Sequence, residues 1–151
     1  MISHCNGPLE FELPDDWTAE PDKEWGFIYY RKGDDDSALR VNVIIGKKSD
    51  ATASEFYKTI TDEQNKHPNS QLTYSNQRPI LFHEKELIED GCELKQYFWQ
   101  TGNFIPPNCG QMATFSYTIL RHRESDLQNI ADIEALSKAV KSLKFVGARP
   151  L

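Results

Sequence analysis

Residues 111–120 read QMATFSYTIL, and this stretch decides the fold class because its side chains alternate along its whole length. Successive side chains of a β-strand point to opposite faces of a sheet. One face of this stretch is apolar and aromatic and is formed by Ala113, Phe115, Tyr117 and Ile119. The other face carries three hydroxyl groups, from Thr114, Ser116 and Thr118. The stretch therefore predicts a long strand at the centre of a sheet.

Related patterns predict strands elsewhere in the chain. Alternating residues, or runs rich in β-branched and aromatic residues, are found at residues 9–13, 26–31, 38–45, 71–75, 83–88 and 93–100. An acidic loop at residues 32–37 joins the second and third of these strands into a hairpin. The Asp90-Gly91 pair between the last two strands is a hairpin-turn signal. These neighbouring strands are therefore expected to be antiparallel.

The first of two predicted helices begins at a capping box. Thr52 and Glu55 have the spacing at which two side chains satisfy amide donors of the first helical turn. The helix is expected to run to about Lys66, because the residue before Pro68 avoids helical backbone angles. Its buried stripe is predicted to be narrow and to consist of Ala53, Phe56, Ile60 and Tyr57.

The second predicted helix lies near the C-terminus and ends near Ser142. Its apolar residues have helical spacing and are Ile130, Ile133, Leu136, Val140 and Leu143. Asn129 or Asp132 is placed to cap its start. The order strands, helix, strands, helix predicts an α+β fold in which an antiparallel β-sheet is flanked by helices.

The length of the chain indicates how many domains it forms, and its charge indicates which partners are excluded. Its 151 residues match a single domain, residues 1–151. Seventeen basic and 23 acidic side chains give a net charge of -6 without a stripe of Lys and Arg, so no nucleic acid partner is expected. The basic run at residues 121–123 is followed by acidic residues and is interpreted as a solvated strand end.

The sequence favours a cytoplasmic protein without a membrane partner. The N-terminus lacks the features of a secretory signal, and no stretch approaches the ~20 apolar residues that span a bilayer. Cys5, Cys92 and Cys109 are odd in number and widely spaced, which fits a reducing compartment. The alternative is an exported protein in which two of these three cysteines form a disulfide.

Sequence signatures of catalysis are missing. The chain contains no Gly-x-Ser-x-Gly elbow and no Gly-rich phosphate loop, so neither an enzyme nor a cofactor is predicted. His4 and Cys5 are metal-ligand types, but two adjacent ligands without a second pair favour a mobile terminus. Asp34, Asp35 and Asp36 lack the spaced ligands and closing Glu of a calcium loop, which favours a solvated hairpin tip. No metal site is predicted.

The segment at residues 100–110 is the strongest candidate for binding a protein partner. Loops usually lie at the surface, yet this one contains four adjacent apolar residues, Phe104, Ile105, Pro106 and Pro107. The alternative is that the first two fold back over an open end of the core. Tyr97 and Trp99, on the preceding strand, are candidates to line a groove for an apolar peptide or helix, or else to be core beneath a helix.

Two short patterns and the order of elements resemble a known superfamily. The patterns are LPDDW at residues 13–17, after the opening strand, and VKSLKF at residues 140–145, at the end of the closing helix. The superfamily includes the PsbP extrinsic protein of photosystem II, a nuclear-transport factor that binds Ran, the DcrB-like proteins and the effector-associated chaperones of type VI secretion. The resemblance implies a PsbP-like α/β/α sandwich that binds, scaffolds or chaperones proteins.

Three hypotheses for function follow. The leading one is a non-enzymatic protein-binding or chaperone-like domain. The second is a small-molecule- or metal-linked enzyme built from the scattered His, Cys and acidic residues, which a pocket with convergent titratable groups would favour. The third is a purely structural subunit, for which a stable homo-oligomer such as a homodimer would be evidence.

Overall fold

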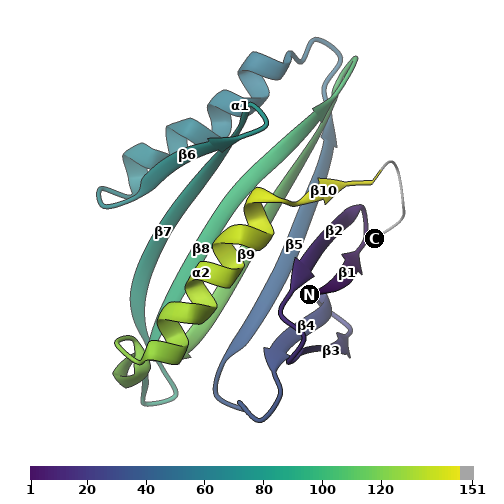
Figure 1. Cartoon of the computed structure of the whole chain (residues 1–151). Coiled ribbons are helices and arrows are strands. Elements are labelled where there is room, and N and C mark those ends of the chain that lie inside the picture. The colour runs from purple at the N-terminus through teal and green to yellow at the C-terminus, as the bar shows by residue number, and fades with distance from the viewer. Residues whose placement is uncertain (147–151) are drawn as a thin grey trace.

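The computed structural model describes residues 1–146 and has the predicted α+β fold. Its strands and helices, in chain order, are β1 (Ile2–Asn6), β2 (Leu9–Leu13), β3 (Trp17–Asp22), β4 (Gly26–Arg31), β5 (Ala38–Lys47), α1 (Ala53–Asp62), η1 (Glu63–Lys66), β6 (Gln71–Ser75), β7 (Arg78–Glu89), β8 (Cys92–Ile105), β9 (Cys109–Leu120), η2 (Arg121–Arg123), α2 (Leu127–Lys141) and β10 (Lys144–Phe145). Figure 1 shows the long strands side by side, with α2 lying in front of them and running in roughly the same direction.

Seven strands form one antiparallel sheet in the order β3-β4-β5-β9-β8-β7-β6. β9 lies at its centre, as the alternation of residues 111–120 predicted. β7 and β8 are longer than predicted, because residues 78–82 of β7 pair with β6 and residues 101–105 of β8 pair with β9. Asp90 and Gly91 in the turn between β7 and β8 have φ values of 50° and 79°, the left-handed conformation that a tight hairpin needs.

The remaining strands form a small antiparallel sheet in the order β1-β2-β10. It covers part of the core, because the Phe11 ring of β2 packs 5.1 Å from Phe115 and 5.3 Å from Tyr29. The prediction of a mobile N-terminus is wrong. Residues 2–6 pair with β2 along their whole length, and burial lowers the pKa of His4.

α1 begins where the capping box predicts. The Thr52 hydroxyl accepts the backbone N–H of Glu55 at 3.2 Å. The α-helix ends at Asp62, and the 3₁₀ turn η1 continues to Lys66. The buried stripe of α1 is shorter than predicted. Ala53 is exposed, whereas Phe56, Tyr57 and Ile60 are at least partly buried.

α2 differs most from its predicted form. Asp126 occupies the N-cap position, so neither Asn129 nor Asp132 caps the helix. Both lie on its buried face, 6% and 3% exposed, whereas Ile130 is 55% exposed. Hydrogen bonds explain this reversal, because each of the two buried polar side chains is bonded to a tyrosine hydroxyl of the sheet beneath.

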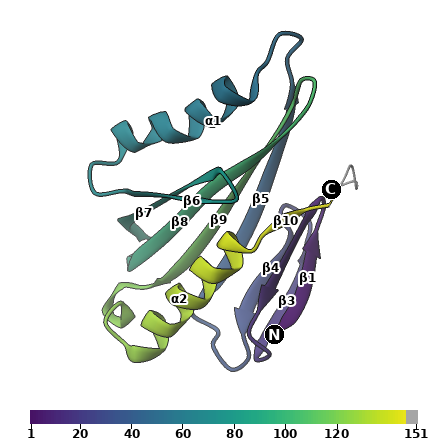
Figure 2. The same ribbon diagram turned by 45° about the horizontal axis from the view of Figure 1, so that its top comes forward.

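The two helices lie over different parts of the large sheet, as Figure 2 shows. α2 covers the odd-numbered side chains of β8 and β9, and Trp99 Nε1 donates a hydrogen bond to Ser137 Oγ at 3.2 Å. α1 contacts even-numbered positions near one end of the same strands. There the Phe56 ring lies against Gly102 and Gly110, which have no side chains to exclude it. Much of the even-numbered surface is therefore left without a helix.

Candidate functional site

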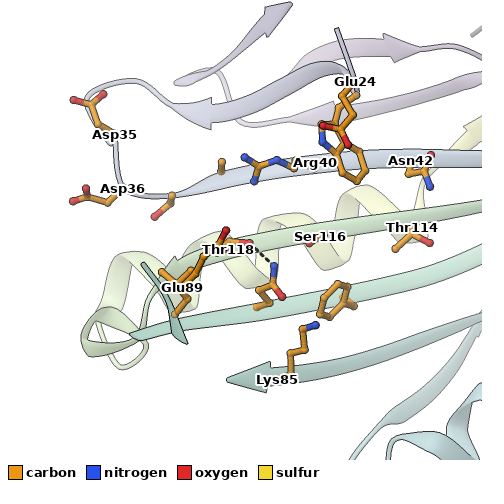
Figure 3. Close-up of a pocket in the computed structure, with 16 residues that line it drawn as sticks. Glu24, Asp35, Asp36, Arg40, Asn42, Lys85, Glu89, Thr114, Ser116 and Thr118 are labelled. Carbon is orange, nitrogen blue, oxygen red and sulfur yellow. Dashed lines mark hydrogen bonds between the residues drawn. The ribbon is translucent and has the colours of Figure 1, made fainter. Parts of the chain in front are cut away.

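The even-numbered residues of β8 and β9 form the floor of a groove of about 820 Å³. The strand register places Ser116 of β9 between Arg40 of β5 and Phe98 of β8. Figure 3 shows Arg40 and Ser116 on neighbouring strands and Lys85 two strands beyond Ser116, with Asp35 and Asp36 at one end of the groove. We call this surface the open face and define it by Arg40, Asn42, Lys85, Gln96, Phe98, Thr114, Ser116 and Thr118.

Two cations of the open face lack an acidic partner. Arg40 and Lys85 form no salt bridge with any residue in the described part of the chain, and Lys85 Nζ lies 5.4 Å from the centre of the Phe98 ring. The Gln96 amide donates to the Thr118 hydroxyl at 3.1 Å, which holds that part of the floor in place. The carboxylates of Glu24, Asp35, Asp36 and Glu89 also line the groove, so it offers charges of both signs, beside hydroxyl groups, to a polar ligand.

A smaller pocket of about 420 Å³ adjoins the open face on the side of α1. Ile44 and Met112 continue the rows that Asn42 and Thr114 begin, two residues further along β5 and β9. We call it the apolar pocket and define it by Ile44, Gly46, Phe56, Phe104, Gly110 and Met112. A polar groove and an apolar pocket therefore lie next to each other on one side of the sheet.

His83 of β7 supports the aromatic part of the open face. Its ring is stacked 4.9 Å from Phe98 on one strand neighbour and 3.7 Å from His67 of the segment after η1. The side chain is 8% exposed. Burial, together with the nearby His67 and Lys85, lowers the pKa of His83 to about 4.

We expect the protein to lose stability as the pH falls from about 6.5 to 4. In this window unfolded His83 binds a proton but folded His83 does not, so protonation favours the unfolded state. The loss attributable to His83 is on the order of 2 kcal/mol. Urea unfolding at several pH values would measure it against a His83→Phe variant. Equal pH dependence in both proteins would contradict the assignment.

A buried charged cluster lies beneath α2, on the side of the sheet opposite to the open face. The Arg31 guanidinium donates to Asp34 and to Asp132, both at 3.0 Å, and Arg123 donates to Asp34 at 3.2 Å. The hydrogen bond to Asp132 raises the pKa of Arg31, and burial raises the pKa of Tyr117, whose hydroxyl donates to the same carboxylate. The cluster ties the β4–β5 loop, η2 and α2 together.

This cluster corrects two predictions. Asp34 is 6% exposed, so only Asp35 and Asp36 of the acidic loop are at a solvated tip. Burial alone would raise the pKa of Asp34, but hydrogen bonds from the Asp36 backbone and from Arg123 hold it below its ordinary value. The interpretation of the basic run holds only in part. Arg121 and His122 are exposed directly after β9, but Arg123 is half-buried and bonded to this carboxylate.

Among residues 1–146, no group of three or more His, Cys, Asp or Glu side chains is arranged to hold a metal ion. No disulfide joins Cys5, Cys92 and Cys109. Within the same residues, no helix has the length and apolar character needed to span a bilayer.

Comparison with protein-family models gave no match, and comparison with curated proteins gave none either. Solved structures do match. A crystal structure from Bacteroides thetaiotaomicron VPI-5482 aligns with a TM-score of 0.65 and 16% identity, over 91% of this chain and 45% of that one. The chain thus spans less than half the length of the Bacteroides protein.

Two further structures align over most of both chains. LpqN, which is involved in cell envelope biogenesis of Mycobacterium tuberculosis, aligns with a TM-score of 0.62 and 11% identity, over 90% of this chain and 82% of LpqN. PsbP from the cyanobacterium Synechocystis sp. PCC 6803 aligns with a TM-score of 0.40 and 16% identity, over 91% and 86%. The similarity to the Bacteroides structure and to LpqN is one of fold. Identities this low say nothing about shared activity.

Two of the six residues predicted to bind a partner belong to the core. Tyr97 and Trp99 are 6% and 2% exposed. The Tyr97 hydroxyl accepts a hydrogen bond from Asn129, and the Trp99 indole donates one to Ser137, so α2 covers both. The groove in the structure lies on the opposite face of their strand.

The other four residues lie at the β8–β9 hairpin, because both strands continue into the predicted loop. Phe104 lines the apolar pocket and donates its backbone N–H to the Tyr57 hydroxyl at 3.1 Å. Ile105 is half-buried, and Pro106 and Pro107 are exposed at the tip. A role of this hairpin in partner binding stays a prediction.

The main residues of the open face were not predicted as a site, although part of the signal is in the sequence. Three hydroxyl residues alternate along the central strand, and such a face is unsuited to packing against an apolar helix. Arg40, Lys85 and Phe98 come from three other strands. Only the register of the sheet shows that they surround these hydroxyl groups.

Proposed function

We propose that the protein is a non-enzymatic binding domain that holds a segment of a partner protein, as a chaperone or accessory subunit does. The observation that carries this proposal is the open face, a groove of about 820 Å³ with hydroxyl, amide and cationic side chains on its floor. Antiparallel sheets often leave one polar face in water. Here that face also carries two cations without acidic partners and an aromatic ring, which are features of binding surfaces.

The adjoining apolar pocket supports a protein segment as the ligand. Protein interfaces combine a few apolar anchors in pockets with polar contacts around them. Ile44, 63% exposed, and Met112 supply apolar surface next to the polar floor. As part of the same proposal we assign the layers to the α/β/α sandwich class. The contacts of α1 and α2 with alternate residues of β8 and β9 support this assignment.

The proposal is tested by affinity capture from the native cell extract. The tagged protein is expected to recover one reproducible, stoichiometric partner that an unrelated acidic domain does not recover. Partners would be identified by mass spectrometry. A clean absence of any partner would overturn the proposal in favour of a small-molecule role.

The double substitution Arg40→Glu and Phe98→Ala is expected to reduce recovery of this partner about tenfold, since charge and aromatic contacts dominate binding energies. Lys138→Glu is the matched control, because Lys138 is 70% exposed on α2, away from the open face. Circular dichroism would establish that both variants are folded. Equal recovery by the two variants would contradict binding at the open face.

The variant Ile105→Asp tests whether the tip of the β8–β9 hairpin contacts the partner in addition to the open face. If the tip also contacts the partner, as the sequence predicted, this variant loses recovery while its helices and strands stay intact. Unchanged recovery would remove the hairpin from the binding surface and leave the open face as the proposed site.

A further inference from the structure

β5 is paired very differently on its two sides. Along its whole length it pairs with β9. On its other side it meets β4 at only two positions, Ile28 with Arg40 and Tyr29 with Leu39. Among the residues that the structure describes, no strand pairs with that side of β5 beyond these positions. Residues 44–47 therefore present an open backbone edge.

This edge carries apolar side chains. Ile44 is 63% exposed and Ile45 is 42% exposed, on opposite faces of the strand. An unpaired row of backbone N–H and C=O groups with exposed apolar side chains is the surface on which another strand adds. Since β9 holds β5 along its full length, the edge is preformed and needs no rearrangement to accept a partner.

The edge also borders the apolar pocket. Ile44 and Gly46 contribute to its wall, and Phe56 and Met112 lie further inside. In a strand added beside β5, the side chain opposite Ile44 would lie about 4.5–5.5 Å from it on the same face. That side chain would therefore lie at the mouth of the pocket. Strand addition obtains affinity from main-chain hydrogen bonds and selectivity from such pockets.

The charges near the edge indicate which strand it accepts. Lys47 forms no salt bridge with any of residues 1–146, and Lys48 makes only long contacts with Asp50 and Glu55, at 3.9 and 4.0 Å. The side chains of Lys48, Asp50 and Glu55 are each at least 60% exposed, so solvent screens these two ion pairs. An acidic residue at the end of the added strand would find cationic partners here.

We infer that the edge of β5 binds an extended segment of a partner protein with an apolar centre and an acidic residue at the end beside Lys47 and Lys48, and that one of its apolar side chains enters the apolar pocket. This inference rests on the proposed function and names the partner's chemistry and its mode of binding. The segment lengthens the seven-stranded sheet at residues 44–47 and is a second contact of the same partner, beside the one that the proposed function places on the floor of the open face.

The probe is a synthetic eight-residue peptide with a core of alternating valine and threonine and an aspartate at each end. Its control has the same core with lysines at the ends. Both are titrated into the isotope-labelled full chain and followed by amide and methyl NMR. The aspartate peptide is expected to shift the amides of residues 44–47 and the methyl groups of Ile44 and Met112. It should bind about fivefold more tightly than the lysine peptide at low salt.

Two variants locate the binding. Ile44→Asp is expected to weaken the aspartate peptide about tenfold, because it removes apolar contact and adds repulsion. Ile88→Asp is the matched control, since Ile88 is 72% exposed at the far end of β7. This variant should bind the aspartate peptide as tightly as the wild type does. The variants' spectra show whether each is folded.

Other outcomes overturn the inference in different ways. Shifts confined to Ser116, Thr114 and Gln96 would place the ligand on the floor, which removes strand addition but keeps the proposed function. A wild-type dimer that Ile44→Asp dissociates would make a second copy the occupant of the edge. If millimolar peptide shifts no signals, while Arg40→Glu with Phe98→Ala reduces partner capture as expected, the binding of a strand at the edge of β5 is rejected and the proposed function is kept.

Discussion

Replacing Asp132 with alanine is expected to lower the free energy of unfolding by about 3–5 kcal/mol. Its carboxylate is 4% exposed and accepts hydrogen bonds from Arg31 at 3.0 Å, Tyr117 at 2.9 Å and Gln128 at 2.9 Å. Without it, the Arg31 guanidinium, which is 14% exposed, loses one of its two carboxylate partners inside the protein. A buried charge left short of partners costs far more than the pair contributes.

The effect is measured by urea unfolding at neutral pH. Glu134→Ala, on the same helix, is the matched control. Its salt bridge with Lys138 lies between side chains 68% and 70% exposed, so its loss should cost less than about 0.5 kcal/mol. A change below about 1 kcal/mol for Asp132→Ala would mean that water reaches the cluster and replaces the lost oxygen atoms.

Gly110→Ala is expected to destabilise the protein by about 1–3 kcal/mol and to displace α1. A Cβ atom at this position would lie 2.5 Å from two carbon atoms of the Phe56 ring, a distance that such atoms do not adopt. The ring must move, and with it the covering of the apolar pocket. The positions of α1 and of the apolar pocket wall therefore both depend on the absence of a Cβ atom at position 110.

A double-mutant cycle tests this coupling. Phe56→Leu removes most of the clash, so Gly110→Ala should cost clearly less in that background than in the wild type. Gly46→Ala is the control, because no atom lies within 4 Å of a Cβ at that position. Purely additive losses would show that Gly110 is needed for the backbone of β9 and not for the ring of Phe56.

The alternation of residues 111–120 is strong enough to predict the central strand and both of its faces. Such a pattern is local, because each side chain's face is set by its neighbours along the chain. The Thr52 cap and the Asp90-Gly91 turn are local in the same sense. The structure has all of these features where the sequence predicts them.

The orientation of α2 was predicted less well, because apolar spacing alone indicated its buried side. Ile130 satisfies the helical spacing yet is exposed, while Asn129 and Asp132 are buried. Their burial depends on Tyr97 and Tyr117, which lie on two different strands. No pattern within the helix contains that information, because hydrogen-bond partners so far apart in sequence meet only after the sheet has formed.

The sequence by itself determined the fold class, the central strand with its polar face and the starting point of α1, since these depend on contacts between residues close together in the chain. Only the tertiary structure decided that Arg40, Ser116, Phe98 and Lys85 share one surface. The same holds for the open edge of β5 beside the apolar pocket. Strand order and register bring these groups together, and both depend on pairing between distant segments.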